Sequence, residues 1–209
     1  MPVKNRVKVS ASYNSFIKEI ERLKKFDFAN HNKFLKKELT KSQIELLVES
    51  IFFAAYRSYE GFLREIFLLY CLEKQPKRKP KVKSFLKPKD FEHSEQLIKS
   101  SMRYLDWTSP DTVIDRSEIY LHNGHPIKLP FTTNKQSLYE FRKIRNHIAH
   151  NSVESQSEYE KVIKNYYNYL PLTIPSPGQY LMLTLKKKTG NYILLDFFEL
   201  MKTISVDLT

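Results

Sequence analysis

Arg145, Asn146 and His150 place a guanidinium, an amide and an imidazole within six residues of one another. An imidazole with a pKa near neutrality can accept the proton of a ribose 2′-hydroxyl. A guanidinium can bind the neighbouring phosphate through two parallel hydrogen bonds and stabilise the charge that develops on it. These groups are the ones that cleavage of RNA without a metal ion requires, although an Arg and a His at this spacing also occur by chance in many helices.

The segment 135–150 is expected to form one helix that carries all three residues, with Thr133 or Asn134 as its cap. On a helical wheel, its apolar stripe contains Leu138, Phe141, Ile144 and Ile148. The opposite side should face solvent and contains Gln136, Glu140, Lys143 and His147. The flank between these faces contains Arg142, Arg145, Asn146, Ala149 and His150. Asn146 and His150 are one turn apart, and the small Ala149 leaves space beside them, so this flank is predicted to be concave.

A long helix should precede the motif and form the centre of the fold. Thr40 and Gln43 have the spacing of a capping box, and no proline follows until Pro76. Apolar residues between Ile44 and Leu69 cover more than one side of this segment, so we expect burial on several sides and a contribution to a subunit interface. Shorter helices are predicted at 12–26, at 91–105, and from a capping box at Ser155-x-x-Glu158 to about Leu170.

The predicted fold class is mainly α, with a small β-hairpin near the C-terminus. Only 4 residues are glycine, which leaves few sites for the tight turns of a β-sandwich or barrel. The runs 180–185 and 192–195 flank a turn-like Lys-Lys-Lys-Thr-Gly-Asn segment and predict the hairpin, with a short helix at about 197–205 after it. We therefore expect a helical domain over 1–170, interrupted by a basic insertion at 74–90 and an irregular one at 107–133. The appended hairpin and helix would occupy 171–209.

The chain is strongly basic, with 35 Lys and Arg against 23 Asp and Glu and a formal net charge of +12. Such a charge favours a polyanionic partner, because binding to phosphates releases counterions. Eight of these cations lie with three prolines in the loop 74–90, which is either a solvated loop or a contact for a phosphate backbone. The candidate RNA-binding residues are Lys77, Arg78, Lys79, Lys81 and Lys83 in this loop and Arg142 in the motif helix.

Other features narrow the class of protein. Cys71 is the single cysteine, so neither an intramolecular disulfide nor a pair of thiolate metal ligands can form. The first residues lack the apolar core of a signal peptide, and no run is long enough to span a membrane. These features predict a cytoplasmic protein with no membrane-spanning segment, and no cofactor is expected.

The segment from Phe141 to Asn151, FRKIRNHIAHN, resembles the Arg-polar-x3-His signature of the HEPN superfamily. The long preceding helix, with its segment 54–62 (AAYRSYEGF), and the helix after the motif agree with this resemblance, which covers roughly residues 12–170. The chain looks most similar to stand-alone prokaryotic groups associated with conflict and defence, such as the RiboL-PSP branch.

This resemblance implies a helical bundle that forms a homodimer across the motif helices, so that two copies of the motif share one cleft. Members are typically metal-independent endoribonucleases that act as toxins or antiviral effectors, and some are controlled by a cognate antitoxin or regulator. By position, Arg145 and His150 would be catalytic and Asn146 would assist them. Glu60 would be the acidic residue that some members bring to the site.

Several alternatives stay open. A HEPN dimer without catalytic activity could instead bind RNA or a partner protein, and a DNA-binding antitoxin would need a recognition helix that the sequence does not show. His147 and His150 could bind a metal ion together with His93, His122 or His125, although no carboxylate or thiolate ligand is evident. The tyrosines at 166, 167 and 169 could stack on bases, but aromatic residues at helical spacing more often pack in a core.

Overall fold

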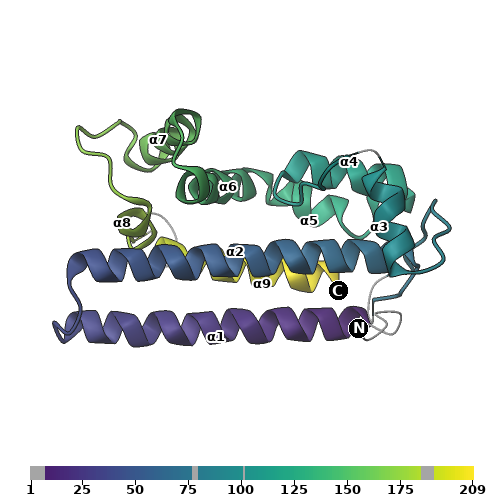
Figure 1. Ribbon diagram of the computed structural model, residues 1–209, viewed down its shortest axis with the longest axis horizontal. Helices are drawn as coiled ribbons and strands as arrows, with labels where there is room; N and C mark the ends of the chain where they lie inside the picture. The colour runs from purple at the N-terminus through teal and green to yellow at the C-terminus, as the bar shows by residue number, and fades with distance from the viewer. Residues whose placement is uncertain (1–7, 77–79, 101, 185–190) are drawn as a thin grey trace. The chain divides into compact units, whose positions relative to one another are not determined.

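The structure is a computed structural model that describes residues 8–76, 80–100, 102–184 and 191–209. Figure 1 shows that these residues are helical over most of their length, which confirms the mainly α class. The chain divides into two compact units. Unit 1 consists of Met1–Lys18, Tyr59–Leu138 and Lys202–Thr209, and unit 2 consists of Glu19–Ser58 and Tyr139–Met201. The long helices α1 (Val9–Leu35), α2 (Lys41–Cys71) and α9 (Ile193–Leu208) each contribute residues to both units.

Unit 1 also contains α3 (Phe91–Lys99), α4 (Pro110–Tyr120), a 3-10 turn (His122–Gly124) and α5 (Lys128–Thr133). Its core is aromatic: the Phe16 and Phe62 rings are stacked with centroids 4.7 Å apart, and the Phe67 and Trp107 rings lie at 5.2 Å. The stretch 107–133 was expected to be irregular, and that expectation is wrong. Ser109 caps α4, where Pro110 occupies the first turn and its missing N–H costs nothing.

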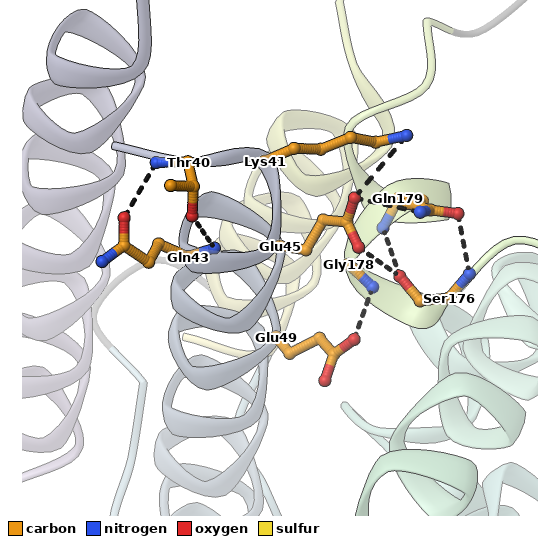
Figure 2. A network of polar contacts seen from close by, with 8 residues as sticks. All are labelled: Thr40, Lys41, Gln43, Glu45, Glu49, Ser176, Gly178 and Gln179. Atoms are coloured by element: carbon orange, nitrogen blue, oxygen red, sulfur yellow. Dashed lines mark hydrogen bonds and ion pairs between the residues drawn. The ribbon is translucent and has the colours of Figure 1, made fainter. Parts of the chain in front are cut away.

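Unit 2 contains α6 (Lys135–His150) from Tyr139 onward, α7 (Val153–Tyr167) and α8 (Pro177–Leu181). The predicted capping box of α2 is confirmed: the Thr40 N–H donates to Gln43 Oε1 at 2.8 Å, and the Gln43 N–H donates to Thr40 Oγ1 at 3.3 Å (Figure 2). The core of this unit is centred on the ring of Phe197 in α9, which lies 4.7 Å from that of Phe52 in α2 and 4.9 Å from that of Phe141 in α6.

Helix α8 packs closely on α2. The Gly178 N–H donates to Glu49 Oε1 at 2.8 Å, while Glu45 accepts hydrogen bonds from Ser176 Oγ at 3.1 Å and from Gln179 Nε2 at 3.0 Å (Figure 2). Two carboxylates of α2 therefore bind the first turn of α8, where backbone N–H groups have no partner within the helix.

The predicted C-terminal hairpin is wrong for the described residues. Tyr180 and Leu181 belong to α8, which begins with a capping box between Ser176 and Gln179, and α9 already begins at Ile193. Only an isolated bridge between Thr184 and Tyr192 remains, and the expected turn at 185–190 lies outside the described residues. The cause is the spacing of buried residues in α9, which follows a helical period: Ile193, Leu194, Phe197, Phe198, Met201 and Ile204.

Candidate active site

Helix α6 has the bounds that the sequence predicts, Lys135–His150. Within the expected core stripe, Leu138 and Ile144 are buried, whereas Phe141 and Ile148 are half-buried. The helix ends because Asn151 has a positive φ of 44°, and Ser152 then begins α7 through a reciprocal capping box with Ser155. This cap lies three residues before the expected one at Ser155. His150 is therefore the last residue of α6, directly before the connection to α7.

Arg145 is half-buried, and its guanidinium contacts one amide and two aromatic rings. Its Nη1 donates a hydrogen bond to Oδ1 of Asn146 at 3.0 Å. Its guanidinium carbon lies 6.0 Å from the centre of the Phe53 ring and 5.9 Å from the centre of the Tyr56 ring, both in α2. A cation held over aromatic faces in this way gains about 0.5–2 kcal/mol, with more at less hydrated sites. The guanidinium and the amide of the predicted motif are thus in direct contact.

His150 is exposed and lies one helical turn beyond Asn146. Ala149 beside it is also exposed. The His150 imidazole is therefore open to solvent, whereas the Arg145 guanidinium is restricted by its contacts with Asn146 and the two aromatic rings of α2. One helix therefore carries an oriented cation and an exposed imidazole.

His147 does not face solvent as expected, and that prediction is wrong. Its ring stacks on the ring of Tyr159 in α7, with centroids 4.8 Å apart and planes 11° apart. Burial lowers the pKa of His147, so the neutral imidazole is favoured. Lys143, on the same side of α6, forms an ion pair with Glu158 at 3.0 Å. Helix α7 therefore contacts this face at Lys143 and His147, whereas Gln136 on the same face is exposed as predicted.

The remaining predicted residues lie in different parts of the chain. Arg142 is half-buried in α6, within unit 2. Glu60 is half-buried in α2 and belongs to unit 1, so its role stays a prediction. Lys81 and Lys83 are exposed in unit 1, whereas Lys77, Arg78 and Lys79 lie outside the described residues.

Hydrogen bonds hold the backbone of the basic loop near Lys83. The side-chain amide of Gln75 pairs with the backbone of Val82, accepting from its N–H at 2.7 Å and donating to its carbonyl at 3.0 Å. The Ser84 N–H donates to Glu73 Oε1 at 3.0 Å. These bonds fix the backbone on either side of Lys83, so this lysine extends from an ordered segment.

No group of three or more His, Cys, Asp or Glu side chains in the described part of the chain is arranged to hold a metal ion. His147, one of the histidines considered as a ligand, is stacked on Tyr159. Among the same residues, no helix is long and apolar enough to cross a membrane.

Comparisons with models of protein families, with curated proteins and with solved structures found no match for this chain. The interpretation of the site therefore depends on the residues described above.

Sequence reasoning missed Phe53 and Tyr56 as parts of the site. The two residues are three positions apart in α2, and this spacing predicts a shared helical face but not the residue that packs on it. The signal in the sequence was an aromatic pair on one face of the helix that precedes the motif. This pair could have suggested a cation–π contact with the motif arginine.

Proposed function

We propose that this chain is a metal-independent endoribonuclease of the HEPN type. The supporting observation is the arrangement on α6: Arg145 is held half-buried by Asn146 and two aromatic rings, while His150 is exposed on the same helix. A guanidinium that binds the phosphate and an imidazole that accepts the 2′-hydroxyl proton are two of the groups that transesterification at a ribose 2′-hydroxyl uses.

In the proposed reaction, His150 accepts the proton of the 2′-hydroxyl, and the 2′-oxygen attacks the adjacent phosphorus. The new O2′–P bond replaces the P–O5′ bond, which leaves a 2′,3′-cyclic phosphate on one product. The 5′-oxygen of the other product takes a proton from an imidazolium or from water. Arg145 binds the non-bridging phosphate oxygens, whose charge increases as the bond forms. Asn146 orients the guanidinium.

The proposal includes a homodimer across the motif helices, because one exposed imidazole supplies only one acid–base group. A second copy of α6 would bring a second Arg145 and His150 to the same cleft. We propose that the substrate is RNA and that the protein acts in the cytoplasm. Its biological role would be that of a toxin or antiviral effector, whose activity a cognate antitoxin or regulator controls.

The decisive experiment measures cleavage of a short RNA in the presence of EDTA. Cleavage should continue without a metal ion, should stop when the nucleotide at the scissile position is a deoxynucleotide, and should leave DNA intact. Replacing His150 with Ala should lower the rate by about 10²–10⁴, the usual contribution of an acid–base group. Arg145→Lys should also be poor, since an ammonium cannot reproduce the two parallel hydrogen bonds. Asn146→Ala should have a smaller effect.

Two matched controls come from the same chain. His122→Ala removes an exposed histidine of unit 1, and Arg57→Lys alters an exposed arginine of α2. Both variants should cleave RNA like the parent. Loss of activity in EDTA, or equal losses in His150→Ala and His122→Ala, would refute the mechanism. A parent protein that binds RNA without cutting it would favour the non-catalytic RNA-binding module instead.

A further inference from the structure

The Arg145 guanidinium lies over two aromatic side chains of α2. The centres of the Phe53 and Tyr56 rings lie 6.0 Å and 5.9 Å from its central carbon. The two residues are three apart in one helix, so their side chains share a face and meet the same cation together. We call Phe53 and Tyr56 the aromatic cage of Arg145.

The cage is itself held firmly by the core of unit 2. Tyr56 is 2% exposed, and its ring stacks on that of Phe197 with centroids 5.9 Å apart and planes 2° apart. Phe197 is fully buried and also contacts Phe141, which lies on α6 one turn before Arg145. Residues from α2, α9 and α6 therefore form one continuous aromatic cluster that ends at the guanidinium.

We infer that Phe53 and Tyr56 are positioning residues, which fix the plane of the Arg145 guanidinium so that it meets a phosphate edge-on. This inference rests on the proposed function. An arginine side chain has several rotatable bonds, and ordering it as the transition state forms would cost conformational entropy. The two rings beneath it and the amide of Asn146, which accepts a hydrogen bond from its Nη1, order it beforehand. A phosphate binds a guanidinium in the plane of its N–H groups, so the cage determines the direction of approach.

Phe53 is the better residue for a test, because it is half-buried whereas a truncation of Tyr56 would also open the core. Phe53→Leu removes the aromatic face and keeps an apolar side chain. Phe53→Tyr is the matched control, since it keeps the ring. Both variants are made in the full chain, and their melting temperatures are measured beside that of the parent.

The first readout does not depend on RNA cleavage. The Nε–H resonance of Arg145 is observed by NMR and is identified by its loss in Arg145→Lys. Ring currents should shift this proton upfield of the corresponding proton of the exposed Arg57. Phe53→Leu should move the resonance toward that of Arg57, and Phe53→Tyr should leave it in place. An unchanged resonance in Phe53→Leu would overturn the inference.

The second readout is the steady-state cleavage of RNA. Phe53→Leu should lower kcat roughly three- to thirtyfold, the range that corresponds to a cation–π contact. KM should change by less than about twofold, because the orientation of Arg145 matters most for the charge of the transition state. Phe53→Tyr should retain the parent kcat.

Different outcomes separate the inference from the proposed function. A resonance that moves in Phe53→Leu while kcat stays at the parent value would overturn the positioning role. A lower melting temperature in Phe53→Leu with unchanged resonance and kcat would make Phe53 a purely structural residue. If the parent cleaves no RNA, the proposed function fails, while the NMR shift still decides whether the cage orients Arg145.

Discussion

Gly178 should tolerate no side chain, because α8 packs on the backbone of α2. A Cβ at this position would lie 2.4 Å from the carbonyl oxygen of Glu45 and 2.8 Å from its carbonyl carbon and Cα. Ordinary contacts between such atoms are about 3.5 Å or longer, so α8 would have to move away from α2 by roughly 1 Å. That movement would weaken the hydrogen bond from the Gly178 N–H to Glu49, which is 2.8 Å long, and those from Ser176 and Gln179 to Glu45.

The expected cost of Gly178→Ala is about 3 kcal/mol of unfolding free energy, from overpacking and from weakened hydrogen bonds to a charged group. For a chain of this size, that cost lowers the melting temperature by about 6–12 °C. Gly61 provides the matched control: it is exposed in the middle of α2, and a Cβ there meets no atom within 4 Å. Gly61→Ala should stabilise the protein by about 0.5–1 kcal/mol, because alanine favours a helix.

The assay is thermal unfolding followed by circular dichroism at 222 nm, a signal that helices dominate. The direction in which each variant shifts the melting temperature decides the result. Gly178→Ala should unfold at a lower temperature than the parent and Gly61→Ala at a slightly higher one. If Gly178→Ala unfolded at the parent temperature, the close contact between α8 and α2 would be refuted. If both variants were destabilised alike, the loss would reflect alanine itself and not the contact with Glu45.

Two further predictions concern pH and salt. Asp27 raises the pKa of His31, so His31 should stabilise the fold most below about pH 6.5 and lose this contribution as the pH rises through its folded pKa. Burial lowers the pKa of His147, so its contribution should be present above about pH 6.5 and decline as the pH falls. In urea unfolding, His31→Gln should therefore be more destabilising at pH 5.5 than at pH 8, and His147→Gln should show the opposite trend. A variant without its expected trend would contradict the assignment for that histidine. RNA binding should weaken steeply with salt, and an unchanged slope after neutralisation of the basic loop would show that the loop does not contact phosphate. The residues to neutralise are Lys77, Arg78, Lys79, Lys81 and Lys83.

The sequence alone determined the features that depend on neighbours along the chain. The bounds of α6 followed from the period of its apolar residues, and the start of α2 followed from the capping box at Thr40 and Gln43. Both are local properties, since a helix satisfies its backbone hydrogen bonds within itself. The same reasoning failed near the C-terminus, because a short apolar run such as 192–195 fits either a strand or the first turn of a helix. In the structure, Phe197 and Met201 are buried further along the same helix, and this helix already begins at Ile193.

Only the tertiary structure decided which residues surround the motif. A helical wheel places His147 on a polar face, but it cannot reveal that Tyr159 from α7 stacks on the His147 ring. It also places Arg145 at the edge of the core without identifying Phe53 and Tyr56, which are about ninety residues earlier in the chain. Contacts between distant segments depend on how whole helices pack, and helical periodicity specifies the side of a helix that is buried but not its partner.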